Sequence, residues 1–324
     1  LTDVTGVQTC ALPISTGPMP AEWAGQVILI GGATGVGKTE AILEAAQRWG
    51  AEVVVADSMQ VYCGLDIGTA KPTSRELARV PHYGIDLVDF RQDFSVLEWL
   101  GHARRAASEI LARGCRVIVA GGTGMYLKAF AVGLSSPLPD HASEEWWAEV
   151  RGRGLEENIA ALLRLDPEAG RWIDLANARR VERALEQVTV TGRSLGMLRA
   201  QWTRRELWPQ RLPLLVFDRE SESLRQRQRR RLEAMLAAGW VEEVMALRER
   251  GYGPGMTAYQ ALGYREIWAA LEAGDWPGAW AEKIAVRTWR YARRQRTWFR
   301  HQMPGRWMEP WKLREIPRWE AWFE

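Results

Sequence analysis

The sequence predicts an α/β protein with a parallel-sheet core, an inserted all-helical subdomain and a helical C-terminal region. Three observations predict it. Short β-branched runs alternate with helical patterns through the first half of the chain, about sixty residues of purely helical pattern then interrupt them, and helical pattern resumes from Asp218 to about His301. The chain has 324 residues, 47% of them hydrophobic and 26% charged, which is enough to bury a sizeable core and excludes a disordered chain.

Four segments are predicted to be strands of one sheet. They are VILI (27–30), EVVVAD (52–57), CRVIVA (115–120) and PLLVF (213–217). The helical pattern at 39–49 separates the first two, and the amphipathic pattern at 95–113, closed by Gly114, precedes the third. Buried β-branched runs separated by helices are typical of a parallel sheet.

The domain boundaries follow from these patterns. We expect residues 139–203 to form the helical insertion, and residues 24–138 and 204–324 to form the core with its helical C-terminal part. Residues 1–15 resemble the conceptual translation of a sequencing adapter (VTGVQTCALPI at 4–14), so we interpret them as a non-native extension.

Composition limits the compartment and the partners. No run approaches the roughly 18 apolar residues of a membrane span. Three cysteines without CxxC spacing suggest neither a disulfide framework nor a zinc site, which favours a reducing cytoplasm. The first basic residue is Lys38, so no charged leader is expected. We expect a cytoplasmic monomer with no membrane partner.

The net charge of +3 is unevenly distributed. Residues 1–200 carry a net charge of −4, whereas residues 201–324 carry +7 and hold 12 of the 18 tryptophans. A basic, aromatic half indicates nucleic-acid binding, but a GC-rich genome that prefers arginine gives the same composition. Composition alone leaves both interpretations open.

A glycine-rich motif follows the first predicted strand and opens the first helix. GATGVGKT (32–39) fits G-x-x-x-x-G-K-[ST], the phosphate-binding P-loop, so the core is predicted to be P-loop NTPase-like. Backbone N–H groups and the helix dipole attract phosphate, Lys38 adds charge, and the Thr39 hydroxyl can ligate Mg²⁺. The predicted diphosphate ligands are Gly32, Ala33, Thr34, Gly35, Val36, Gly37, Lys38 and Thr39, with Thr39 also the metal ligand.

The other strand ends differ from those of a nucleoside triphosphatase. The third strand runs into Gly121-Gly122-Thr123-Gly124 and has no acid for a second Mg²⁺ contact. Asp57 instead follows the second strand, beside the predicted phosphate loop. It could hold a metal, cap the next helix or act as a base.

With these residues identified, the chain from about residue 26 resembles the tRNA dimethylallyltransferase (tRNA isopentenyltransferase) family. Ordered blocks carry the resemblance: GGATGVGKTE (31–40), ADSMQVYCGLDIGTAKPT (56–73), VPHYGIDLVD (80–89), VIVAGGTGMYLKA (117–129), GLSSPLP (133–139), NARRVERALEQVTVTGRSL (177–195), ALGYREI (261–267) and TWRYARRQRTWFR (288–300). The resemblance implies transfer of a dimethylallyl group from dimethylallyl diphosphate, with Mg²⁺, to N6 of the adenosine 3′-adjacent to the anticodon in tRNAs that read codons beginning with U.

The resemblance also implies the roles of particular residues. Asp57 and Thr123 would be catalytic, and Arg227 would join the diphosphate ligands. The anticodon stem-loop would be contacted by Asp57, Ser58, Met59, Gln60, Thr123, Arg179, Arg180, Val181, Glu182, Arg183, Gln260, Ala261, Leu262, Gly263, Tyr264 and Arg265. The six arginines between 287 and 300 alternate with aromatic residues, which suits phosphate contact. An arginine that the family often carries after the PLP turn is missing, since that stretch reads DHASEEWW.

Three other functions share part of this evidence. A P-loop small-molecule kinase would explain residues 32–39 but not the DSMQVY or TWRYARRQRTWFR blocks. An adenylate isopentenyltransferase would need neither the basic half nor the helical insertion. A non-enzymatic RNA-binding module would have no use for Lys38, Thr39 and Asp57 together.

Overall fold

The computed structural model describes residues 17–134, 142–202, 208–209, 211–274 and 279–323. The chain divides into two compact units, residues 133–207 and the remainder, where the sequence predicted an insertion at 139–203. In the described ranges no helix is long and apolar enough to cross a membrane.

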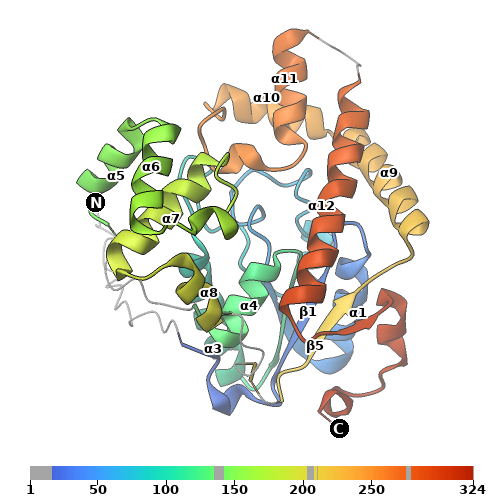
Figure 1. The fold of residues 1–324 in the computed structure, drawn as a ribbon. Helices are drawn as coiled ribbons and strands as arrows, with labels where there is room; N and C mark the ends of the chain where they lie inside the picture. Colours follow the sequence, from blue (N-terminus) through green and yellow to red (C-terminus); the bar gives the residue numbers. More distant parts are fainter. Residues whose placement is uncertain (1–16, 135–141, 203–207, 210, 275–278, 324) are drawn as a thin grey trace, which may run out of the picture. The chain divides into compact units, whose positions relative to one another are not determined.

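The larger unit is built on a six-stranded sheet in which every neighbouring pair is parallel (Figure 1). The strand order is β3-β2-β4-β1-β5-β6. The strands are β1 (Val27–Gly32), β2 (Ala51–Val55), β3 (His82–Tyr83), β4 (Arg116–Gly121), β5 (Leu214–Phe217) and β6 (Arg306–Met308). This confirms the predicted α/β class; β3 and β6 are short edge strands that the sequence did not predict.

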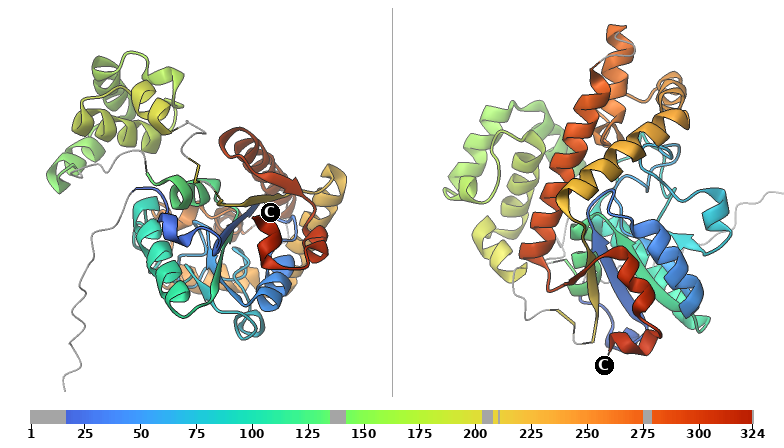
Figure 2. Two further views of the ribbon diagram at one scale, coloured as in Figure 1. Left: turned by 90° about the horizontal axis from the view of Figure 1, so that it is seen from below. Right: turned by 90° about the vertical axis from the view of Figure 1, so that its right-hand side faces the viewer.

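Helices cover both faces of this sheet (Figure 2). α1 (Lys38–Trp49) packs on one face with the 3₁₀ turns at Pro310–Glu315 and Trp319–Trp322, and α3 (Val96–Ala112) and α4 (Gly124–Val132) pack on the other. Successive residues of β1 point to opposite faces of the sheet, and both faces are buried. Ile28 and Ile30 pack in the cluster that contains α1, and Val27 and Leu29 are equally buried. A capping box of Ser95 and Glu98 starts α3 one residue after the predicted boundary.

The remaining helices of this unit extend beyond the strand ends (Figure 1). They are α2 (Ser74–Leu77), α9 (Ser221–Ala237), α10 (Trp240–Glu249), α11 (Tyr264–Ala273) and α12 (Trp280–Gln302). α12 packs against α9, α11, α4 and β1, so one helix from the C-terminal region reaches the centre of the sheet.

The smaller unit is entirely helical in its described residues. Its helices are α5 (Glu144–Gly152), α6 (Leu155–Leu165), α7 (Ala178–Thr191) and α8 (Leu195–Trp202). They enclose their own core, in which Val150, Leu162, Val181 and Leu185 are buried. Asp166 ties two of its segments together, because its carboxylate accepts the N–H of Leu195 at 2.7 Å.

Candidate active site

The register of the sheet brings the sequence motifs together. Gly31 of β1 pairs with Gly121 of β4, and Val55 of β2 pairs with Ala120. The P-loop, the Gly121–Gly124 turn and Asp57 therefore leave the sheet at the same edge, where parallel α/β folds bind their ligands.

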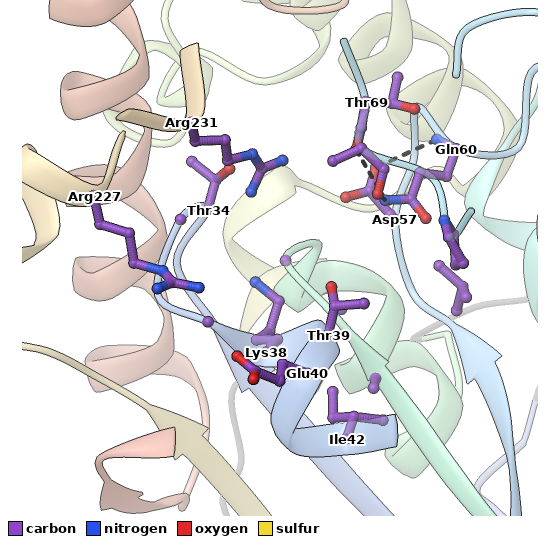
Figure 3. A pocket seen from close by; sticks show the side chains of 18 of the residues that line it. Thr34, Lys38, Thr39, Glu40, Ile42, Asp57, Gln60, Thr69, Arg227 and Arg231 are labelled. Atoms are coloured by element: carbon purple, nitrogen blue, oxygen red, sulfur yellow. Dashed lines mark hydrogen bonds between the residues drawn. The ribbon is translucent and has the colours of Figure 1, made fainter. Parts of the chain in front are cut away.

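Two cavities open at this edge. The first, of about 600 Å³, is lined by the P-loop, Asp57 and a set of arginines (Figure 3). The second, of about 430 Å³, is lined by Ser58 and Met59 together with residues of α9, α12 and the 260–262 segment. The residues common to both cavities are Thr34, Gly35, Asp57, Thr69, Arg231 and Tyr291. The two cavities therefore meet beside Asp57.

The P-loop has the backbone that its glycines allow. Gly35 and Gly37 adopt φ values of 83° and 106°, which other residues rarely reach, and Gly37 directly precedes α1. The first N–H groups of α1 have no intrahelical partners and point toward the cavity side of the loop. Of the eight predicted ligands, Thr34, Gly35, Gly37, Lys38 and Thr39 line the first cavity, whereas Ala33 and Val36 are buried in the core.

Lys38 is a buried cation at the floor of the first cavity. Its Nζ donates to the carbonyl oxygens of Gly32 at 2.8 Å and Ala33 at 3.0 Å. Burial, reinforced by the positive charge of Arg231, lowers the pKa of Lys38 from 10.5 to about 8, although Asp57 acts in the opposite direction. A buried lysine with a lowered pKa, in a cavity lined by further cations, is typical of an anion-binding site.

Four arginines face this cation: Arg219, Arg227, Arg230 and Arg231. The sequence singled out only Arg227; Arg230 and Arg231 lie beside it on α9, whereas Arg219 precedes that helix. Arg231 lies one turn beyond Arg227 on α9, so both side chains reach the cavity (Figure 3). Burial holds the pKa of Arg231 below its usual range. The cavity therefore brings five cationic side chains together with the carboxylates of Glu40, Asp57 and Glu76.

Of the three roles that the sequence left open for Asp57, the structure shows a cap, although of a turn and not of the next helix. Its Oδ1 accepts the backbone N–H of Met59 at 2.9 Å and of Gln60 at 3.4 Å, so it caps the turn after β2. Among the described residues Oδ2 makes no hydrogen bond, and Asp57 lines both cavities. One carboxylate oxygen thus holds the turn while the other is available to a ligand.

Thr123 contacts the turn that follows β2. Its hydroxyl oxygen accepts the N–H of Ser58 at 3.1 Å, and its own N–H donates to Ala56 at 3.1 Å. The lining of the first cavity includes Gly121 and Gly122 but not Thr123. Thr123 therefore holds the turn that carries Asp57 and Ser58, and its predicted catalytic role stays a prediction.

Only the first half of the segment 260–265, which was predicted to contact tRNA, lines a cavity. Gln260, Ala261 and Leu262 line the second cavity, whereas Gly263 starts α11 and Arg265 pairs with Glu266 at 3.2 Å. The side chain of Tyr264 is fully buried and its hydroxyl donates to Glu243 at 2.6 Å, and the predicted contact of this residue with tRNA stays a prediction.

Glu243 was not anticipated from the sequence. Its carboxylate accepts backbone N–H groups of Asp66, Ile67 and Gly68 at 3.1, 2.8 and 3.4 Å. It thereby anchors the loop that carries Thr69 to α10. Gln60 holds the other side of this loop, because its amide donates to the Thr69 carbonyl at 3.0 Å.

The predicted arginines of the insertion lie on α7, within the smaller unit. Arg179, Arg180 and Arg183 are exposed on this helix. Arg183 pairs with Glu186 at 2.9 Å and lies over the Trp147 ring. Glu182 is half-buried and Val181 is fully buried, and the predicted contact of these residues with tRNA stays a prediction.

The fold and site define a P-loop α/β protein whose anion-binding cavity opens onto a second cavity. The sequence profile of the IPP transferase family matches residues 60–302, and that of isopentenyl transferases matches residues 25–85. The chain therefore belongs to the IPP transferase family, the tRNA dimethylallyltransferases.

Individual relatives match over most of their length. The tRNA dimethylallyltransferase of Opitutus terrae is 41% identical over 280 residues, which is 85% of this chain and 90% of the relative. That of Thermus thermophilus is 41% identical over 289 residues, 86% and 90% of the two chains. The structure of tRNA isopentenylpyrophosphate transferase from Bacillus halodurans superposes with a TM-score of 0.66 at 32% identity, covering 92% and 96%. A eukaryotic dimethylallyltransferase acting on tRNA gives a TM-score of 0.71 at 25% identity, covering 87% and 73%.

Proposed function

We propose that this chain transfers a dimethylallyl group from dimethylallyl diphosphate to N6 of the adenosine 3′-adjacent to the anticodon, in tRNAs that read codons beginning with U. The observation that carries the proposal is the meeting of the two cavities at Asp57. One cavity suits a diphosphate, the other is large enough for a base, and the carboxylate lies where the two substrates would react.

The first cavity would hold the donor. The P-loop N–H groups, Lys38 and the arginines Arg219, Arg227 and Arg231 offer positive charge to the two phosphates. In the reaction, the bond between the allylic carbon and the diphosphate oxygen breaks and its electron pair leaves with diphosphate. Charge thus accumulates on the leaving group, and fixed cations stabilise that charge in the transition state.

Asp57 would remove the proton from the acceptor. The new bond forms between N6 and the allylic carbon, and the N6 proton moves to the Asp57 carboxylate. An exocyclic amine is a poor nucleophile, and a positioned base contributes roughly 10²–10⁴ in rate. Thr123 and the Met59 and Gln60 amides hold this carboxylate in place.

Mg²⁺ would bind beside Thr39. The Thr39 hydroxyl lines the first cavity next to Lys38 (Figure 3), and phosphate-bound Mg²⁺ usually keeps several waters and few protein ligands. The described residues contain no group of three or more His, Cys, Asp or Glu that could hold a metal alone, so a site with one hydroxyl and substrate oxygens fits them. When bound there, Mg²⁺ supplies additional positive charge to the diphosphate.

The acceptor would be recognised through basic helices. Arg290, Arg293 and Arg294 line a shallow cavity on α12 together with Trp298, and Arg179 and Arg180 are exposed on α7 of the smaller unit. Arginine and aromatic side chains bind RNA backbone and unstacked bases. Since a stacked adenine cannot present N6 to Asp57, the base must leave the stack of the anticodon loop, at a cost of a few kcal/mol.

We also propose that the protein works in the cytoplasm as a monomer. Its two described cysteines are both free thiols, which suits a reducing compartment. Both cavities and Asp57 are formed within one chain, so the site requires no second copy.

A labelled-donor assay tests the proposal. The protein is incubated with labelled dimethylallyl diphosphate, Mg²⁺ and tRNA, AMP or ATP as separate acceptors. We expect label in tRNA only. Label in AMP or ATP would favour an adenylate isopentenyltransferase, phosphate transfer from ATP would favour a kinase, and tRNA binding without label transfer would favour an RNA-binding module.

A further inference from the structure

Gln295 of α12 touches both glycine-rich turns of the site. Its Oε1 accepts the N–H of Thr34 at 2.9 Å, and its Nε2 donates to the Gly122 carbonyl at 2.9 Å. The residue is 7% exposed. Because an N–H only donates and a carbonyl oxygen only accepts, the side-chain amide has one orientation here and uses both of its ends.

The glycines of the two turns make room for this helix. A Cβ at Gly122 would lie 2.6 Å from Nε2 of Gln295, and a Cβ at Gly31 would lie 2.5 Å from the Phe299 ring. At Gly124 it would overlap the Trp298 ring. Residues 295, 298 and 299 share one face of α12, so these glycines serve the close approach of a helix as well as that of a phosphate.

The two hydrogen bonds of Gln295 connect the P-loop, which would hold the donor, with the turn that supports Asp57. On one side, Gly122 precedes Thr123, whose hydroxyl holds the Asp57–Ser58 turn. On the other side, Thr34 is also held at its carbonyl by Nε2 of Gln228 at 2.9 Å. Thr34 therefore uses both backbone polar groups to fix the P-loop, and its N–H is occupied by Gln295.

We propose that Gln295 is a positioning residue for the transfer reaction: it sets the separation between the loop that holds the diphosphate and the turn that carries Asp57. This inference rests on the proposed function. Gln295 lines the first cavity, but its two side-chain ends are used by Thr34 and Gly122, so its proposed role is not a contact with a substrate. It acts through the Thr34 and Gly122 peptides, and it thereby aligns the allylic carbon with the base.

Gln295→Met is the informative variant, since methionine has a similar length but no strong hydrogen-bonding groups. A misplacement of about 1 Å in an active site costs about a hundredfold in rate, so we expect kcat to fall about ten- to a hundredfold. The Kd of inorganic diphosphate should rise severalfold, and the Kd of an anticodon stem-loop should stay unchanged. Gln226→Met is the matched control, because Gln226 is an exposed glutamine on α9 and lines neither cavity.

A double variant tests the same contact from the other partner. Gly122→Ala places a methyl group against Nε2 of Gln295, while the nearest other atom outside Gln295, the Gly32 carbonyl oxygen, is 3.7 Å away. Gly122→Ala should therefore reproduce the defect of Gln295→Ala. The double variant Gly122→Ala/Gln295→Ala should be no worse than Gln295→Ala alone, because both changes remove one contact.

The outcomes separate this inference from the proposed function. If the wild-type protein transfers no label to tRNA, the proposed function fails, and the diphosphate affinity of Gln295→Met still tests the bridge. A purely structural role would lower the rate in proportion to the folded fraction and leave the diphosphate Kd of the folded protein unchanged. That result, or defects that multiply in the double variant, would overturn the positioning role of Gln295.

Discussion

Raising the pH should weaken donor binding through the titration of Lys38. With a pKa of about 8 in the free protein, Lys38 is about nine-tenths charged at pH 7 and about one-tenth charged at pH 9. If the bound diphosphate keeps Lys38 charged throughout this range, the Kd of dimethylallyl diphosphate should rise about tenfold between these pH values. The ligand does not offset this change, because the last ionisation of a phosphate group lies near pH 6.

The neighbours of Lys38 should not contribute to this change. Arg231 stays charged, while burial lowers the pKa of His82 below 6.5 and raises that of Tyr291 above 10, so both rings stay neutral from pH 7 to 9. The assay is titration calorimetry of dimethylallyl diphosphate without tRNA, at several pH values. Lys38→Arg is the control, since arginine does not titrate there. A flat profile in the wild type, or an equal slope in Lys38→Arg, would refute this reasoning.

The same pKa has a consequence for the ligand-free fold. A value of about 8 instead of 10.5 means that the charged Lys38 costs the native state about 3 kcal/mol. The unfolded chain binds more protons between these values, so the contribution of Lys38 to stability is most unfavourable below pH 8 and improves as pH rises to 10.5. Dimethylallyl diphosphate should therefore raise the melting temperature more at pH 7 than at pH 9.

Three further predictions concern single groups of the site. Asp57→Asn keeps an acceptor for the Met59 amide but cannot take a proton, so kcat should fall by about 10²–10⁴ with tRNA affinity little changed. Neutralising Arg179, Arg180 and Arg183 together should flatten the salt dependence of tRNA binding by up to about three phosphate contacts and leave donor binding unchanged. Glu243→Leu should release the 66–68 amides and raise the KM for tRNA, as steady-state kinetics would measure.

Each of these has a result that would contradict it. An Asp57→Asn enzyme with more than a tenth of wild-type turnover would remove the role of general base. An unchanged salt dependence of tRNA binding in the triple arginine variant would mean that these arginines of α7 do not contact tRNA phosphates. Equal loss of donor and tRNA affinity in Glu243→Leu would indicate general unfolding instead of a local change in the loop.

The sequence predicted the four central strands because short, local residue patterns mark them. Each of the four predicted strands lies within two residues of its observed bounds, since β-branched runs flanked by turn residues mark buried strands. The edge strands β3 and β6 have two and three residues, too few to show a period. Their pairing is set by the neighbouring strands.

The site was predictable where one segment carries the chemistry. The P-loop and Asp57 stood out because a short motif and a strand end reveal them. Gln295 and Glu243 did not, because their partners lie 261 and about 176 residues away along the chain. Tyr264 illustrates the converse limit, because a family block marks the position but does not reveal that its side chain is buried against Glu243.

The dependence of the P-loop on α12 has a consequence for biosynthesis. A ribosome completes β1 and α1 early, yet Gln295, which fixes Thr34, is synthesised 261 residues after Thr34. A nascent chain or a truncated fragment ending before residue 280 would thus lack a finished donor site, even with its phosphate motif intact. Since contacts between distant segments form late and slowly, the protein should acquire affinity for diphosphate only in its last folding step.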